Sequence, residues 1–498
     1  MSNRSKPKIL LLSDDLRMHS GVATMSRELV LGTVKWFDWV QLAGAISHPD
    51  KGKIINMDAA TAQMTGVSDA KVVLYPVDGY GNEELVFNIM DREKPNAIMH
   101  FTDPRFWTWL YSLEKQIRSR IPLTYLNIWD DVPFPMYNKP YYESCDLIMS
   151  ISKQTFNLNK HVLGKDQSCE ITDTGDLTGK SILHYVPHGI NAVTFKPIPK
   201  DDTLLVKRRK EILGDKDYKF VLFYNSRNVQ RKRTSNIMLA YKAFCDNLTK
   251  EEADKCVLVL HTEVRCDAGT DLIAVKEAFC PEYNIVFSPG KYTPDDMNFL
   301  YNIADVTVNL SSNEGFGLST AESLMSGTPI IVAVTGGLQD QIGQVKDDGS
   351  PIEFDDNFGT NSIGKYKKHG VWAYPCWTKV RCVQGSIPTP YIFDDMTKWE
   401  DCAEGMMYWY LMGDEKRTKC GAEGRRWALN EGGINAENMC AQFTKCMNFT
   451  LENFKPVKQF GLYTADDYCG NKMEGGMGFE IPVIDKEKLK QEAEAVAI

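Results

Sequence analysis

The sequence predicts an α/β protein built on parallel sheets, and three observations lead to this prediction. The chain has 498 residues, enough for two or three domains that each bury a core. Hydrophobic residues make up 43% of the chain and charged residues 25%, as in ordinary soluble globular proteins. Short apolar runs alternate with segments of helical periodicity, which is typical of parallel sheets covered by helices on both faces.

The clearest single unit lies between residues 305 and 337. The apolar run 305–310 predicts a buried strand, and the turn formers 311–313 follow it. From Leu318 onward the apolar residues have helical spacing, until Gly327 and the proline after it end the helix. A second apolar run then predicts another strand, which completes a βαβ unit. The helix of such a unit begins at the carboxyl edge of the sheet.

The turn of this unit has the chemistry of a sugar-nucleotide site. The first amides of a helix lack intrahelical partners and lie at the positive end of its dipole, so they suit a phosphate. Gly315 and Gly317 carry no side chain that would block its approach. Glu314 and Glu322 flank the turn, and their carboxylates accept hydrogen bonds from hydroxyl groups. A phosphate between hydroxyls predicts a nucleotide-diphosphate sugar.

The segment EGFGLSTAE, followed by GTP and by Gly336-Gly337, resembles the donor site of retaining GT-B glycosyltransferases of family 4, the glycogen-synthase-like group. The resemblance implies two Rossmann-like domains facing each other across a cleft. It implies that Glu314 holds the transferred sugar and Glu322 the ribose. It places five residues of the turn at the donor: Glu314, Gly315, Phe316, Gly317 and Leu318. The alternative is a generic Rossmann-like turn that only packs a helix on a strand.

A basic turn precedes this unit by some eighty residues. The apolar run 219–224 predicts a strand, the turn NSRNVQRKR follows it, and a helix begins near Thr234. In the resembled family an Arg and a Lys at this turn hold the diphosphate, and Arg227 and Lys232 match the R-x4-K spacing. Such cations stabilise the charge that the leaving diphosphate gains, so no metal is obligatory. The alternative is a nucleic-acid patch, because four basic residues fall within seven positions.

The predicted domain boundaries follow from this resemblance. Residues 1–195 form an acceptor-side Rossmann-like domain, and 196–435 form the donor domain. Residues 436–456 form a helix that returns to the N-terminal domain, and 457–498 form a tail. The region 343–390 reads as loops, either an acceptor-specific insertion or a cover for the domain face.

Further candidate site residues lie at strand ends, where parallel sheets place functional groups. Gly21 ends the loop after the strand 8–13 and matches the family loop that faces the diphosphate from the opposite domain. His100 matches a histidine that the family carries near the acceptor, and Asp130 lies on the same edge. Tyr292 is expected to contact the nucleotide base. A structural role is the alternative for His100 and Asp130. Five more apolar runs predict strands: 39–45, 71–75, 97–101, 123–129 and 147–151.

The aromatic segment 105–118 predicts a helix. Its expected core stripe consists of Phe106, Trp109, Leu110, Leu113 and Ile117. Trp107 and Tyr111 fall off this stripe and are expected on the surface or in an acceptor groove.

The composition of the chain argues against several classes of function. The net charge of −9 argues against a uniformly basic nucleic-acid surface. No run reaches the ~20 apolar residues that span a bilayer. The thirteen cysteines show no metal-ligand spacing and predict reduced thiols in the cytoplasm.

The function expected from the sequence is retaining transfer of a sugar from a UDP- or GDP-linked donor, without a further cofactor. The acceptor is a glycan, lipid or protein hydroxyl. The first alternative is a modified base in DNA as the acceptor, and the second is a non-catalytic scaffold that binds a sugar nucleotide.

Overall fold

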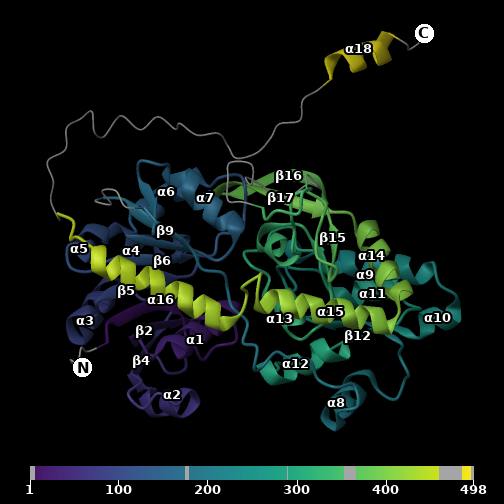
Figure 1. Ribbon diagram of the computed structural model, residues 1–498, viewed down its shortest axis with the longest axis horizontal. Helices are drawn as coiled ribbons and strands as arrows, with labels where there is room; N and C mark the ends of the chain where they lie inside the picture. Colours follow the sequence, from purple (N-terminus) through teal and green to yellow (C-terminus); the bar gives the residue numbers. More distant parts are fainter. Residues whose placement is uncertain (1–5, 174–178, 289, 353–365, 459–484, 495–498) are drawn as a thin grey trace.

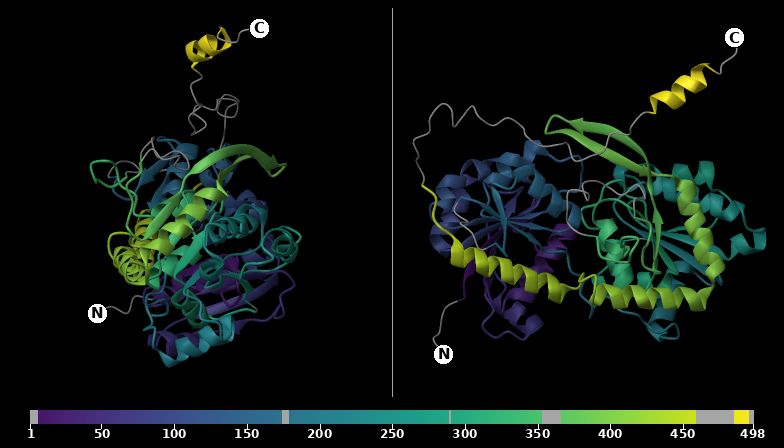
Figure 2. Two further views of the ribbon diagram at one scale, coloured as in Figure 1. Left: turned by 90° about the vertical axis from the view of Figure 1, so that its right-hand side faces the viewer. Right: turned by 45° about the horizontal axis from the view of Figure 1, so that its top comes forward.

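The computed structural model describes residues 6–173, 179–288, 290–352, 366–458 and 485–494. Two lobes lie side by side, and each has a sheet at its centre with helices on both faces (Figures 1 and 2). The α/β prediction with parallel sheets is therefore confirmed.

The N-terminal lobe is built on a nine-stranded sheet of order β3-β4-β2-β1-β5-β6-β7-β9-β8. All its strand pairs are parallel except β3 with β4. The strands are β1 (Lys8–Asp14), β2 (Asp38–Ala45), β3 (Ile55–Asn56), β4 (Val72–Asp78), β5 (Ala97–Phe101), β6 (Leu123–Asn127), β7 (Leu147–Ser150), β8 (Ser168–Glu170) and β9 (Ser181–Tyr185). The helices are α1 (Gly21–Thr33), α2 (Asp58–Thr65), α3 (Glu83–Glu93), α4 (Thr108–Ser112), α5 (Glu114–Arg118), α6 (Lys139–Glu143) and α7 (Lys153–Leu163). The predicted strands of this half are all present.

The C-terminal lobe is built on a six-stranded parallel sheet of order β12-β11-β10-β13-β14-β15. Its strands are β10 (Phe220–Asn225), β11 (Cys256–His261), β12 (Ile285–Phe287), β13 (Val306–Asn309), β14 (Ile330–Ala333) and β15 (Ala373–Cys376). Its helices are α8 (Thr203–Leu213), α9 (Thr234–Asp246), α10 (Lys250–Asp254), α11 (Leu272–Phe279), α12 (Pro294–Ile303), α13 (Leu318–Met325), α14 (Trp399–Met412) and α15 (Asp414–Leu429). The predicted βαβ unit is β13-α13-β14, with Gly317 at the helix N-cap.

The chain crosses between the lobes twice, and the two crossings are hydrogen-bonded to each other. The amide of Ile190 donates to the carbonyl of Ile434 (2.9 Å), and the amide of Ala436 donates to the carbonyl of Ile190 (3.0 Å). A Cβ on Gly189 would lie 2.4 Å from the carbonyl oxygen of Asn435, so only glycine allows this approach. The lobes therefore share a compact hinge.

Helix α16 (Ala436–Asn453) follows the second crossing and lies along the N-terminal lobe, in line with α15 (Figure 2). Phe443 is fully buried, stacks on Trp39 with ring centroids 5.7 Å apart, and meets Phe37 edge-on. In the predicted tail 457–498, residues 459–484 and 495–498 lie outside the described part of the chain. The described part includes α18 (Lys486–Glu494). Within the described ranges, every helix is too short or too polar to cross a bilayer.

The helix predicted over 105–118 is wrong in detail. The chain begins with a 3-10 turn, η1 (Pro104–Trp107), capped by Asp103, and then forms the short helices α4 and α5. A 3-10 turn advances side chains with a period of 3.0 instead of 3.6, which changes the buried face. Phe106 is consequently 62% exposed, whereas Trp107 and Tyr111 belong to the core.

The prediction that the region 343–390 consists of loops is wrong for part of it. Residues 353–365 lie outside the described part of the chain. The region supplies β15 to the sheet and begins an antiparallel hairpin of β16 (Thr378–Ser386) and β17 (Thr389–Thr397). Most side chains of β16 are exposed, so the hairpin lacks the alternating apolar pattern that identifies a strand in sequence. Trp372 is buried and stacks on Trp427, with ring centroids 5.0 Å apart.

Candidate active site

Glycines shape the loop between β13 and α13. Gly317 has φ +91°, and a Cβ there would lie 2.4 Å from the Leu338 side chain. Gly336 has φ +48°, and a Cβ there would lie 1.9 Å from the carbonyl oxygen of Glu314. The amide of Gly337 donates to that same carbonyl (2.8 Å). The two glycines after β14 therefore support the loop that carries Glu314.

Lys232 and Glu314 form a buried ion pair on this loop. Lys232 is the last residue of the 3-10 turn η3 (Gln230–Lys232), and its side chain is 9% exposed. Burial by itself would raise the pKa of Glu314, but the charges of Lys232 and Arg231 bring this pKa below its usual value. Burial lowers the pKa of Lys232, and Glu314 opposes that shift. Glu314 is therefore held as a carboxylate.

Arg231 joins the two lobes at this point. Its guanidinium donates to the carbonyl of Asn313 and lies 3.2 Å from the carboxylate of Asp130 in the N-terminal lobe. A Cβ on Gly315 would lie 2.9 Å from the carbonyl oxygen of Ile128, so the β13–α13 loop itself touches the opposite lobe. Sequence reasoning selected Asp130 but not Arg231, because the R-x4-K spacing gave preference to Arg227.

Arg227 lies at the surface, whereas Lys232 is buried. The side chain of Arg227 is exposed, and no hydrogen bond or ion pair within the described ranges engages it. The short turn between the two residues directs Lys232 inward and leaves Arg227 at the surface. The structure thus brings Lys232 to Glu314, and Arg227 makes no side-chain hydrogen bond or ion pair with either glutamate among the described residues.

Glu322 lies in α13 and accepts a hydrogen bond from the hydroxyl of Tyr301 (2.7 Å). The amide of Asn225 donates to the same hydroxyl (3.1 Å), so β10, α12 and α13 meet at this carboxyl. Burial raises the pKa of Glu322 to about 7, although the Tyr301 hydrogen bond lowers it. Tyr301 and Asn225 were not selected from the sequence, because neither belongs to a recognisable motif.

Two further residues expected at the donor, Gly21 and Tyr292, have different surroundings. A Cβ on Gly21 would lie 3.3 Å from the Leu318 side chain, so the loop before α1 abuts the start of α13 across the interface. Tyr292 stacks on His261 with centroids 5.0 Å apart, at the carboxyl end of β11. Phe316 is buried and meets the ring of His188 edge-on at 5.3 Å.

His100 does not reach the interface between the lobes. It is fully buried in the N-terminal lobe, and its ring nitrogens lie 2.8 Å from the Tyr111 hydroxyl and 2.9 Å from the Thr102 hydroxyl. Burial lowers its pKa to about 3. The structure instead places His188 beside Phe316 of the β13–α13 loop, and its Nδ1 is buried with no hydrogen-bond partner among the described residues. The position of His188 three residues after the end of β9 was the available sequence signal.

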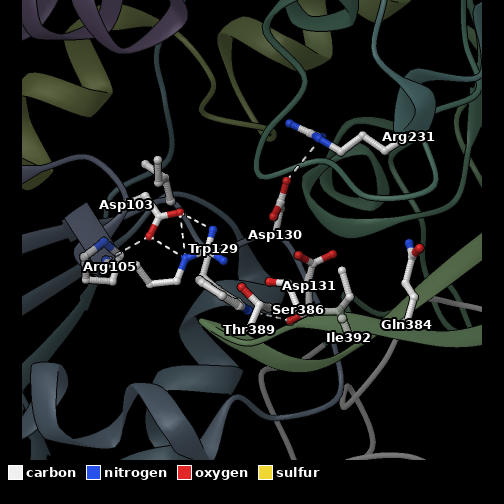
Figure 3. Close-up of a pocket in the computed structure, with 13 residues that line it drawn as sticks. Asp103, Arg105, Trp129, Asp130, Asp131, Arg231, Gln384, Ser386, Thr389 and Ile392 are labelled. Carbon is white, nitrogen blue, oxygen red and sulfur yellow. Dashed lines mark hydrogen bonds and ion pairs between the residues drawn. The ribbon is translucent and has the colours of Figure 1, made fainter. Parts of the chain in front are cut away.

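A pocket of about 480 Å³ opens beside Asp130 and Arg231 (Figure 3). On one side are residues that follow β5 and β6 of the N-terminal lobe, and on the other are residues of the β16–β17 hairpin. The described residues contain no group of three or more His, Cys, Asp or Glu side chains placed to hold a metal ion.

Comparison with known proteins bears on the fold of the chain. Residues 207–356 match the family model described as glycosyl transferases group 1. Anabaena Alr3699/HepE, solved in complex with UDP and glucose, superposes with a TM-score of 0.58 at 14% identity, over 89% of this chain and 99% of that one. Sucrose-phosphate synthase from Thermosynechococcus elongatus gives 0.59 at 13% identity, over 89% and 98%. The chain has the GT-B fold.

The sequence relatives of this GT-B chain match it over only part of its length. A D-inositol 3-phosphate glycosyltransferase of Salinispora arenicola is 26% identical over 190 residues, which are 36% of this chain and 42% of that protein. An uncharacterized glycosyltransferase of Methanocaldococcus jannaschii is 26% identical over 239 residues, 47% of this chain and 48% of that protein. The chain thus spans less than half the length of these curated relatives.

Proposed function

We propose that this GT-B chain is a retaining glycosyltransferase. It transfers a hexosyl or pentosyl group from a UDP- or GDP-linked sugar to an acceptor hydroxyl. The observation that carries the proposal is the buried Lys232–Glu314 pair on the glycine-shaped loop before α13. The solved neighbour that holds UDP and glucose supports a donor of this kind.

In this proposal the donor lies along the start of α13. The amides of Gly317 and Leu318 and the ammonium of Lys232 hold the diphosphate. Glu322 accepts the ribose hydroxyls, and Glu314 accepts the hydroxyls of the transferred sugar. Arg227 turns inward from the surface when the diphosphate binds.

The chemical step is a front-face displacement. The bond between the anomeric carbon and the β-phosphate oxygen breaks, and the acceptor oxygen bonds to the same face of that carbon. The proton of the acceptor hydroxyl passes to the departing phosphate oxygen. Lys232, Arg227 and the helix amides stabilise the charge on the leaving diphosphate, so the step needs no metal.

DNA is not favoured as the acceptor, because the basic residues of the turn, apart from Arg227, pair with carboxylates of the protein. Arg231 pairs with Asp130, Lys232 with Glu314, and Arg233 with Asp394. On α8, a similar basic run also pairs with carboxylates: Lys207 and Arg208 with Glu211, Arg208 with Asp296, and Lys210 with Asp215. A salt-sensitive gel shift with duplex DNA would contradict this argument.

The proposal is tested by a thermal-shift screen of UDP- and GDP-sugars, since a bound donor raises the melting temperature. We expect one sugar nucleotide to raise it and to be hydrolysed or transferred, and NMR of the product to show the anomeric configuration of the donor. Glu314→Gln should lower kcat by at least ~100-fold with the preferred sugar. Binding without turnover would instead favour the non-catalytic scaffold, and absence of any binding would exclude both.

A further inference from the structure

The β16–β17 hairpin belongs to the C-terminal lobe in sequence but is attached to both lobes. The amide of Phe393 donates to the carbonyl of Val132 (2.6 Å), and the hydroxyl of Tyr137 donates to the carbonyl of Tyr391 (2.9 Å). On the donor side, the amide side chain of Asn313 donates to the carbonyl of Phe393 (2.9 Å). The hairpin is therefore fixed one residue away from Glu314.

Among the described residues that line it, the pocket beneath this hairpin has no unpaired cation. Its charged lining groups are three carboxyls and two guanidiniums: Asp103, Asp130, Asp131, Arg105 and Arg231. Arg105 makes a two-pronged ion pair with Asp103, and Arg231 pairs with Asp130 (Figure 3). A phosphate entering this pocket would have to break one of these pairs or remain uncompensated.

Two polar atoms of the lining lack partners within the described structure. They are Oδ1 of Asp131 and Oγ1 of Thr389, and the Thr389 residue is only 4% exposed. Burial raises the pKa of Asp131 well above its usual range, and the charge of Asp130 adds to this shift. Both atoms are buried, so each reaches a ligand in the pocket only when its side chain turns toward it. An unsatisfied buried polar atom costs about 1–3 kcal/mol, so a hydrogen bond gained by such a turn would add to affinity.

The remaining lining suits a sugar. Gln384 and Ser386 of β16 add an amide and a hydroxyl, and Trp129 and Ile392 add apolar surface. Hydroxyl groups both donate and accept, so a polyol can satisfy a mixed set of this kind. The volume of about 480 Å³ falls within the usual range of small-molecule sites, roughly 300–1,000 Å³.

We infer that this pocket binds the acceptor as an uncharged sugar or polyol, and that Thr389 and its neighbours on the hairpin select against phosphorylated acceptors. This inference rests on the proposed function, because it assigns the acceptor class of the same enzyme. A preference for uncharged acceptors would distinguish this chain from the relatives that are named for an inositol phosphate.

The first test uses matched acceptor pairs with the donor that the thermal-shift screen identifies. The pairs are glucose with glucose 6-phosphate and myo-inositol with myo-inositol 1-phosphate, and maltotriose is an extended neutral acceptor. We expect transfer to neutral members at least tenfold faster than to their phosphorylated partners. Equal or faster transfer to the phosphorylated members, or donor hydrolysis with no transfer to any neutral polyol, would overturn the inference and leave the donor assignment standing. Absence of donor binding would instead remove the proposed function.

The second test uses variants of the hairpin. Thr389→Val keeps the side-chain shape, removes the hydroxyl and should raise the acceptor KM about tenfold, with a smaller change in the donor KM. Thr378→Val is the matched control, because Thr378 is also buried with an unpartnered hydroxyl on this hairpin but does not line the pocket. Gln384→Lys adds an unpaired cation and should raise the use of glucose 6-phosphate. An acceptor KM that responds equally to both threonine variants would contradict the assignment.

Discussion

Lys232 and Glu314 occupy a place where two opposite charges are expensive to bury. Removing water from an ion pair costs free energy that the attraction between the charges only partly returns, so a buried pair is weak evidence for a stabilising role. Substrate binding would explain why this pair is present. When the donor binds, Lys232 would pair with the diphosphate and Glu314 would accept hydrogen bonds from the sugar hydroxyls. Neither charge would then be left without a partner.

This argument predicts that stability and donor binding separate in a double variant. Lys232→Met should lower the free energy of unfolding by about 3–5 kcal/mol, because it leaves Glu314 buried and uncompensated. Adding Glu314→Leu should recover most of that loss while donor binding stays absent. Urea unfolding and donor titration on the same samples measure both quantities. If the double variant were as unstable as the single one, the pair would be stabilising in itself.

Glu322 makes the proposed donor binding sensitive to pH. Its pKa of about 7 means that the carboxyl is charged above that pH and protonated below it. A carboxylate accepts hydroxyl hydrogen bonds more strongly than the acid, so donor affinity should fall as pH decreases from 8 to 6, by at most about tenfold per unit. Calorimetric titration across this range is the measurement, and Glu322→Gln should flatten the curve.

Tyr301→Phe provides the matched variant for this prediction. The Tyr301 hydroxyl donates to Glu322 and lowers its pKa, so removing it should move the midpoint of the affinity curve to higher pH. Wild-type affinity that does not change between pH 5.5 and 8.5 would exclude this role for Glu322.

At the scale of elements, the conformation of the β13–α13 loop depends on the turn that follows β14. Gly336→Ala would drive a Cβ into the backbone of Glu314, whereas Gly349→Ala would meet nothing within 4 Å, and both positions have positive φ. Gly349→Ala should therefore show only the conformational cost of about 1–2 kcal/mol, with normal donor affinity. Gly336→Ala should in addition weaken donor binding at least tenfold. Equal effects of both substitutions on donor affinity would show that the loop does not rely on Gly336.

Periodicity and glycine positions were sufficient to predict β13, α13 and β14, since each of these elements is dictated by its own residues. The elements that failed depend on partners far away in the chain. The burial of Trp107 follows from a 3-10 turn that begins at Pro104, and the β16–β17 hairpin is held by contacts with the N-terminal lobe. The choice between Arg227 and Arg231 depends on the path of one short turn, which no spacing rule contains.

For the whole molecule, polar contacts link the two lobes at several places. Besides Arg231 with Asp130 and the hydrogen bonds of the hairpin, a further contact links η4 (Gly336–Gln341) to α7. Asp340 accepts a hydrogen bond from the amide of Lys153 (2.8 Å) at the start of that helix, and the hydroxyl of Tyr185 lies 3.4 Å away. A carboxylate at a helix N-terminus is favourable, yet burial raises the pKa of Asp340 to about 6.

This raised pKa predicts that closure of the lobes responds to pH. Separating the lobes would hydrate Asp340 and return its pKa toward the ordinary value of 3.8, so the closed form binds more protons than the open form. Closure should therefore be favoured as pH falls from about 6 toward 4, by at most on the order of 3 kcal/mol. In small-angle X-ray scattering without donor, the radius of gyration should rise between pH 5 and 7.5. Asp340→Asn cannot ionise and should abolish this rise; if the variant kept it, closure would be governed by other groups.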